Sequence, residues 1–184
     1  MAGVKDLLPL KTNARDRLET HQLLVVGIPP FGKGFAAAVA AHRDEQFRRR
    51  VTVTDTLPLK KEDDTRASID FVCFVASMQS RLSLEKVRES LQAIVPEEQG
   101  FLVMGRWALV VLNSSDPSRF ALTLDDVNGF AKSNELPVLF GGSLDDAKAM
   151  DFLAGRVATL LRRAARENGV SPLFGMASSS RPDV

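Results

Sequence analysis

Short, almost uninterrupted apolar runs recur along the 184-residue chain, and segments with helical spacing or charged loops separate them. The runs lie at 23–26, 69–76, 107–112 and 137–140, and a β-branched run at 51–54 has the two-residue alternation of a strand. An apolar run without alternation is typical of a strand that helices cover on both faces of a parallel sheet. The pattern therefore predicts an α/β fold with four or five strands in a mostly parallel sheet.

The first two helices are expected on either side of the 51–54 strand. An alanine-rich helix is predicted over 34–50, because the three arginines at 48–50 would complement the carbonyl end of a helix. A second helix is predicted over 84–95, where apolar residues share one face and Ser83 stands at the N-cap position.

Two further helices are expected to begin at acidic capping sequences. Thr123-Leu-Asp-Asp126 predicts a short helix that ends near Asn134. Ser143-Leu-Asp-Asp146 predicts the start of a last helix, which Asn168-Gly169 would close. The predicted order is strand-helix-strand-strand-helix-strand-helix-strand-helix.

Length and composition limit the classes of protein that remain. We expect a single domain over 21–175, between a flexible N-terminal segment at 1–20 and a disordered tail at 176–184. The formal net charge of +1 argues against a protein that binds nucleic acid through a broad basic face. The one cysteine, Cys73, excludes an intrachain disulfide and a cysteine-based zinc site, and its apolar surroundings predict a buried, inert thiol. Apolar stretches too short for a membrane helix, and a start without a signal-peptide core, predict a soluble intracellular protein.

The turn after the first strand almost matches a phosphate-binding loop. Gly27-Ile-Pro-Pro-Phe-Gly-Lys-Gly34 fits G-x-x-x-x-G-K-[ST] except at its last position, where a Ser or Thr hydroxyl would ligate Mg²⁺. Gly34 has no hydroxyl, and Pro29 and Pro30 remove two of the N–H donors that such a loop aims at phosphate. The sequence predicts the shape of a phosphate site without its chemistry.

A dinucleotide-binding fingerprint fits less well. Gly32 to Ala37 resembles G-x-G-x-x-A, and Asp55 lies further along at a strand end. The run begins several residues after the strand, however, and a register that starts at Gly27 puts Pro29 at the second glycine.

Two later turns resemble incomplete guanine-nucleotide motifs. Asp55-Thr-Leu-Pro58 follows a strand where a GTPase carries D-x-x-G, with proline in place of the glycine that contacts the γ-phosphate. Asn113-Ser-Ser-Asp116 follows the 107–112 strand where N-K-x-D recognises guanine, and it lacks the lysine. Each match alone is ordinary turn chemistry, but their order along the chain is that of a GTPase. The short distance between the predicted helix and Val51 leaves almost no room for a switch I loop.

The remaining polar residues predict no catalytic or metal centre. His21 and His42 have no companion ligands at useful spacing and are expected to be surface or packing residues. Acidic pairs are expected in loops and first helical turns, where they complement helix dipoles. These pairs are Asp63-Asp64, Glu97-Glu98, Asp125-Asp126 and Asp145-Asp146. The arginines at 48–50 and 162–163 are expected to be solvated helix ends, and the alternative is a docking patch for an acidic partner.

A family resemblance rests on a longer set of residues. Arg66-Ala-Ser-Ile-Asp-Phe-Val-Cys-Phe-Val75, followed by Ser77, Ser80, Ser83-Leu84 and Glu89-Ser-Leu91, is similar to the central segment of the centromere protein M family. The resemblance continues in order through Gly105-Arg106, Leu136 to Phe140, Arg156 to Arg163 and Gly169 to Pro172. It covers most of residues 22–175, and 66–91 is its most specific part.

The resemblance implies a three-layer, small-GTPase-like (P-loop-type) domain with trimmed switch regions that neither binds nor hydrolyses GTP. Members of the family are structural subunits of the constitutive centromere-associated network, the inner-kinetochore assembly on centromeric chromatin in the nucleus. The implied role is in kinetochore assembly and chromosome segregation in mitosis. The implied partners are centromere protein I most directly, with centromere proteins H and K. No membrane, sequence-specific nucleic acid, cofactor, metal or small-molecule substrate is expected.

Two features of the chain bear on that implication. Apolar residues outside the predicted core, at 101–104 and 173–174, are candidate contacts for a partner protein. The retained Lys33, Asn113 and Asp116 leave one alternative open, an active P-loop GTPase or ATPase in which Lys33 contacts the phosphates and Asp55 holds Mg²⁺.

Overall fold

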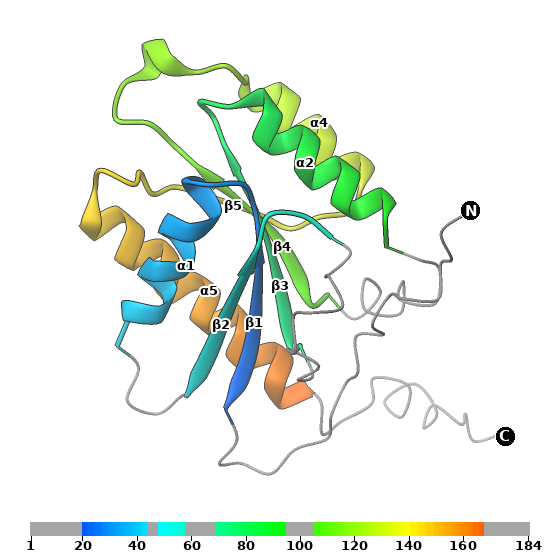
Figure 1. The fold of residues 1–184 in the computed structure, drawn as a ribbon, viewed down its shortest axis with the longest axis vertical. Coiled ribbons are helices and arrows are strands. Elements are labelled where there is room, and N and C mark those ends of the chain that lie inside the picture. Colours follow the sequence, from blue (N-terminus) through cyan, green and yellow to red (C-terminus); the bar gives the residue numbers. More distant parts are fainter. Residues whose placement is uncertain (1–19, 44–47, 58–68, 95–104, 168–184) are drawn as a thin grey trace, which may run out of the picture.

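Five parallel strands form one sheet at the centre of the molecule (Figure 1). The computed structural model describes residues 20–43, 48–57, 69–94 and 105–167, with side chains up to 164. The strands are β1 (His21–Val26), β2 (Arg49–Thr54), β3 (Phe71–Ser77), β4 (Trp107–Leu112) and β5 (Val138–Phe140). They lie in the order β2-β1-β3-β4-β5, and every neighbouring pair is parallel. The predicted parallel α/β fold and its order of elements are confirmed.

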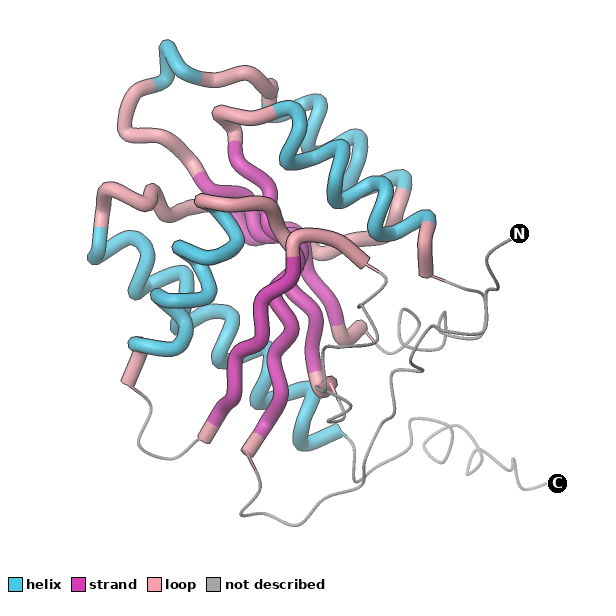
Figure 2. Tube along the Cα trace, viewed as in Figure 1, coloured by secondary structure: helices cyan, strands magenta, loops and turns pink. Residues whose placement is uncertain are grey.

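Helices cover both faces of the sheet, which makes three layers (Figure 2). One face packs against α1 (Phe31–Ala41) and α5 (Ala147–Glu167), and the other against α2 (Arg81–Gln92) and α4 (Leu124–Ser133). A 3-10 turn, η3 (Pro117–Arg119), lies between β4 and α4. Within the described residues, no helix is long and apolar enough to cross a membrane.

The core is divided between the two sheet faces because successive strand residues point in opposite directions. Leu23 and Val25 of β1 belong to the cluster with α1 and α5, whereas Leu24 and Val26 belong to the cluster with α2 and α4. Every residue of β3 and β4 is buried, as the unbroken apolar runs predicted. Burial raises the pKa of the Cys73 thiol far above its ordinary value, which keeps the sulfur protonated.

The first helix is shorter than predicted and begins earlier. It starts directly after Pro30 and ends at Ala41, because His42 has extended backbone angles and donates its N–H to Ala38 O. The prediction of a helix to Arg50 is wrong, since Arg49 and Arg50 open strand β2. Arg49 nevertheless serves a helix end, because its Nε donates to the carbonyl of Val39 in α1 at 2.9 Å.

Two other helix starts differ from the predictions. The N-cap of α2 is Ser80 and not Ser83: Ser80 Oγ accepts the N–H of Ser83, so the helix begins one turn earlier. The last helix begins at Ala147 and not at Ser143, because the Asp146 carboxylate accepts the N–H groups of the two following first-turn residues. The capping box of α4 at Thr123 and Asp126 is confirmed.

The connection between α1 and β2 is the segment in which the sequence predicted a trimmed switch region. Only residues 42–48 separate the end of α1 from the start of β2, and β2 pairs directly with β1 along its whole length. The fold is that of a small-GTPase-like three-layer domain. The predicted N-terminal segment at 1–20 and tail at 176–184 lie, apart from residue 20, outside the described residues, and the domain boundaries stay predictions.

Candidate functional site

The three nucleotide-like motifs follow β1, β2 and β4 and therefore meet at one edge of the sheet. In parallel α/β sheets, ligands bind at the carboxyl ends of the strands, where neighbouring strands lead the chain in opposite directions. Strands β1 and β3 satisfy this condition, because β1 leads through α1 to β2 on one side and β3 leads through α2 to β4 on the other. The loop from Gly27 to Pro30 leaves β1 there and leads into α1 (Figure 1).

The backbone amides of the three motif glycines donate to carbonyls of the chain itself. Gly27 N–H donates to Thr54 O at 2.9 Å, Gly32 N–H to Ile28 O at 3.0 Å and Gly34 N–H to Pro30 O at 2.8 Å. A phosphate-binding loop works by directing such N–H groups at the ligand oxygens. Here helix α1 begins directly after the two prolines, so the amides at Gly32 and Gly34 close its first turn instead.

The first two glycines of the motif are required by packing. A Cβ at Gly32 would lie 2.1 Å from the carbonyl oxygen of Gly27, and a Cβ at Gly27 would lie 2.9 Å from Cβ of Val75. The start of α1 therefore touches the end of β1, and the end of β1 touches β3, with no space for a side chain between them. This close approach accounts for both glycines without a phosphate.

The third glycine of the motif, Gly34, lies against the side chain of Leu144, which is distant in sequence. A Cβ at Gly34 would meet Cδ2 of Leu144 at 2.5 Å. Leu144 belongs to the turn before α5 and is 38% exposed. Its methyl groups fill the position where a Ser or Thr side chain would begin, which is the position of the Mg²⁺ ligand in a complete motif. Lys33, next to Gly34, is exposed in the first turn of α1.

The loop after β2 is tied to helix α2. Thr54 Oγ1 donates to Thr56 O at 2.9 Å, and Leu57 N–H donates to Ser90 Oγ at 3.1 Å. Asp55 is exposed, whereas Pro58 lies outside the described residues. The counterpart of D-x-x-G therefore lies at the predicted sheet edge, with its last described residue held against α2.

The counterpart of N-K-x-D uses its aspartate as a cap. The Asp116 carboxylate accepts the hydroxyl of Ser118 at 2.7 Å and its N–H at 3.0 Å, and it lies 3.5 Å from Arg119 Nε. The hydrogen bonds from Ser118, with a smaller contribution from Arg119, hold the pKa of Asp116 below its ordinary value. Asn113 donates its N–H to Gly142 O at 2.8 Å. These contacts stabilise the turn into η3, as expected of Asn and Asp in a turn.

A serine cluster at the end of β3 was missed by motif analysis. Ser83 Oγ accepts the N–H of Ser77 at 2.9 Å and lies 2.6 Å from the carbonyl oxygen of Ser80, to which it donates. Ser77 and Ser83 are buried. The spacing of three residues between Ser80 and Ser83 was the available signal. A serine three residues after the N-cap can form hydrogen bonds with the N-cap residue.

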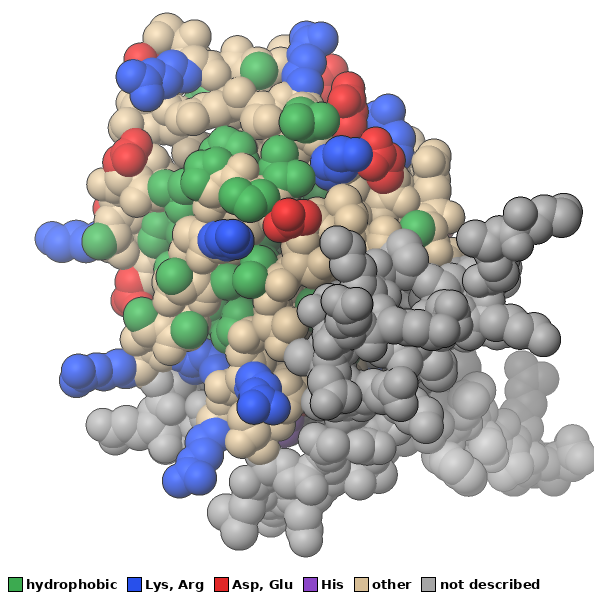
Figure 3. Space-filling model, viewed as in Figure 1, with side chains coloured by type: hydrophobic (Ala, Val, Ile, Leu, Met, Phe, Trp, Pro, Cys, Tyr) green, Lys and Arg blue, Asp and Glu red, His purple; other side chains and the backbone are tan. Residues whose placement is uncertain are grey.

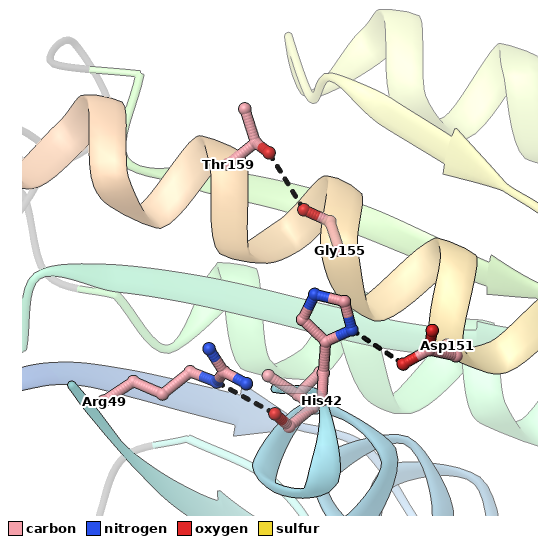
Figure 4. A network of polar contacts seen from close by, with 6 residues as sticks. His42, Arg49, Asp151, Gly155 and Thr159 are labelled. Carbon is pink, nitrogen blue, oxygen red and sulfur yellow. Dashed lines mark hydrogen bonds and ion pairs between the residues drawn. The ribbon is translucent and has the colours of Figure 1, made fainter. Parts of the chain in front are cut away.

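Each histidine lies close to one carboxylate. His42 Nδ1 lies 2.7 Å from Asp151 Oδ1, which joins the end of α1 to α5 (Figure 4). His21 Nδ1 lies 3.6 Å from the buried Asp70. The residues described contain no group of three or more His, Cys, Asp or Glu side chains that could hold a metal ion. Both pairings join distant parts of the sequence, and local spacing gave no signal for them.

Of the acidic pairs named in the sequence, two lie at the starts of helices. Asp126 accepts the N–H and hydroxyl of Thr123, and Asp146 caps α5, as expected for carboxylates at helix starts. Arg162 and Arg163 lie on α5, towards its C-terminal end. The pairs at 63–64 and 97–98 and the apolar segments at 101–104 and 173–174 lie outside the described residues.

Comparison with known proteins gives one finding. A protein-family model described as Centromere protein M (CENP-M) matches residues 12–181, which is most of the chain. No curated protein matches the chain.

Proposed function

The chain belongs to the centromere protein M family, and on that premise we propose that it is a non-catalytic pseudo-GTPase that serves as a structural subunit of the inner kinetochore. Family membership makes it a nuclear protein of the centromere and kinetochore. The proposal adds that its GTPase-like domain has exchanged nucleotide chemistry for protein binding within the constitutive centromere-associated network.

The observation that carries the loss of nucleotide chemistry is the contact between Leu144 and Gly34. Leu144 Cδ2 would lie 2.5 Å from any Cβ at this position, so a Mg²⁺-ligating side chain could enter only if Leu144 moved aside. The internal hydrogen bonds of Gly32 and Gly34 and the local bonds of Asp116 support the same conclusion. Each of these groups contacts a nucleotide in a working GTPase, and in this chain each is used to hold the fold.

We further propose that the chain binds and stabilises centromere protein I, together with centromere proteins H and K. A nearly neutral net charge of +1 fits a subunit that contacts protein and leaves DNA to its partners. The test is reconstitution of the full chain with centromere protein I, followed by size-exclusion chromatography and thermal unfolding of the partner. Co-elution and a raised melting temperature are expected, and separate elution at micromolar concentrations would overturn this part of the proposal.

Nucleotide binding is tested by equilibrium titration with fluorescent GTP and ATP in the presence of Mg²⁺. We expect no saturation below millimolar nucleotide. The Lys33→Ala variant is the matched control, because Lys33 is exposed and its replacement leaves the packing of Gly27 and Gly32 intact. Micromolar affinity that disappears in Lys33→Ala would overturn the pseudo-GTPase and favour the active P-loop enzyme. Unchanged partner binding by Lys33→Ala is expected under the present proposal.

A further inference from the structure

Helix α5 carries a solvent-facing stripe of basic and aromatic side chains. Its members recur at intervals of three or four residues, so they lie on one side of the helix. All are exposed, whereas the residues between them on the opposite side belong to the core cluster. The stripe, called the α5 ridge below, consists of Lys148, Phe152, Arg156, Thr159 and Arg163.

Phe152 is the most exposed large hydrophobic residue of the described part of the chain, at 71%. The ring stands near the N-terminal end of the ridge, between Lys148 and Arg156 one helical turn on each side. Aromatic and arginine side chains are residue types enriched in protein interfaces. A free phenylalanine in water contributes nothing to this fold, and its burial by a partner would contribute about 2 kcal/mol.

The cations of the ridge are not engaged in ion pairs within the described part of the chain. Lys148, Arg156 and Arg163 form no ion pair with any described residue. Within 31–41 and 147–164, the described parts of α1 and α5, Asp151 is the one acidic residue, and its carboxylate is bound to His42 at 2.7 Å. The outer surface of this helix layer is therefore basic, although the whole chain is nearly neutral.

The exposed side of α1 carries small side chains, which allow the backbone of a partner protein to come close. Its exposed residues include Ala37, Ala40 and Ala41. Figure 3 shows hydrophobic side chains gathered over α1 and the adjacent loops. Such small side chains would let a second helix lie along the layer with its backbone near α1.

We propose that the α5 ridge is a docking site for an acidic amphipathic helix of a partner subunit. Phe152 would enter the apolar face of that helix, and Arg156 and Arg163 would pair with its carboxylates at intervals of two turns. The inference rests on the proposed function, because it assigns the contact surface for the protein partner. Charge complementarity decides the occupant, since three cations without an ion pair in the described residues repel a basic segment and attract an acidic one. A single aromatic residue and a net charge of +1 do not provide the stacking and extended basic surface that nucleic acid requires.

The first test uses the reconstituted complex of the full chain with centromere protein I. Arg156→Glu and Phe152→Ser are each expected to weaken binding about tenfold or more, because one reverses a paired charge and the other removes the buried ring. The matched controls are Lys132→Glu and Leu124→Ser on α4, which are exposed on the opposite helix layer and are expected to bind normally. All four positions are solvent-exposed, and circular dichroism checks that each variant is folded.

The outcomes separate the two proposals. Failure of the unmodified chain to bind would overturn the proposed function itself and this inference with it. Binding of the unmodified chain with equal affinity for all four variants would overturn the ridge alone. A photo-crosslinking residue at position 152 then identifies the occupant by mass spectrometry. An acidic helical segment supports the proposal, whereas a basic segment, or DNA captured when the complex is assembled on it, overturns it.

Discussion

The side chain of Leu144 lies against the backbone of Gly34, so that a Cβ at Gly34 would meet Leu144 Cδ2 at 2.5 Å and Cδ1 at 3.4 Å. The contact joins the first turn of α1 to the turn before α5. It occupies the one position of the phosphate-loop motif that the sequence lacks. The absence of a side chain at Gly34 is therefore what allows Leu144 to pack at this position.

A mutant cycle tests this coupling. In the unmodified chain, Gly34→Ser must displace Leu144 and is expected to lower the free energy of unfolding by about 1 kcal/mol. In a Leu144→Ala background the obstacle is gone, and the same serine is expected to raise the free energy by about 0.5 kcal/mol through its better helix propensity. Urea denaturation of the four proteins gives the coupling energy. Additive effects would show that Leu144 does not restrict position 34.

Gly32 of α1 and Gly129 of α4 are expected to respond in opposite directions to alanine. A Cβ at Gly32 would lie 2.1 Å from the backbone oxygen of Gly27, which cannot move without displacing β1, so Gly32→Ala is expected to cost about 3 kcal/mol or more. A Cβ at Gly129 meets nothing within 4 Å, and Gly129→Ala is expected to stabilise the protein by about 1 kcal/mol. Thermal unfolding distinguishes them. A tolerated Gly32→Ala would contradict the packing account of this motif.

The parallel sheet could be predicted from the sequence because burial on both faces removes the polar alternation from a strand. The unbroken apolar residues of β3 and β4 had no other simple explanation, and their burial is complete. Helix ends were predicted less well where several capping residues compete. Ser80 and Ser83 are both suitable N-caps, and the hydrogen bond from Ser83 N–H to Ser80 Oγ is what identifies Ser80 as the cap.

The candidate site could be predicted only in part, for a different reason. The missing hydroxyl of Gly34 was visible in the motif itself, since a motif records local chemistry. Leu144, which fills the space, is distant in sequence, and nothing near it indicates that contact. The pairing of His42 with Asp151 spans 109 residues and was equally invisible. Tertiary contacts of single side chains carry no periodicity, so they must come from the structure.

The capping box of α4 is expected to make stability depend on pH in the acid range. Hydrogen bonds from the N–H and hydroxyl of Thr123 lower the pKa of Asp126 below its ordinary value. The stabilisation is therefore present above the ordinary carboxyl pKa of about 3.9 and is lost as the pH falls through the lower folded value.

Asp126→Asn tests the capping box directly. The variant is expected to be less stable than the unmodified chain near neutral pH, and the difference is expected to shrink towards zero in acid. Urea midpoints measured from about pH 6 down to about pH 2 give both curves. Thr123→Ala removes the other half of the box and is expected to cost about 1 kcal/mol near neutral pH. A difference that stayed constant with pH would contradict an ionised Asp126 as the source.

The contact between α1 and α5 is expected to determine how much stability an alanine at position 155 can add. A Cβ at Gly155 would lie 3.2 Å from Cε1 and 3.3 Å from Nε2 of His42, whose ring is held by Asp151 (Figure 4). Gly155→Ala should gain about 1 kcal/mol of helix propensity, but the ring must shift, so a net change near zero is expected in the unmodified chain. In a His42→Ala background the ring is absent and the full gain of about 1 kcal/mol should appear. Urea denaturation measures both substitutions, and an equal gain in the two backgrounds would mean that the imidazole yields freely and does not hold the two helices in register.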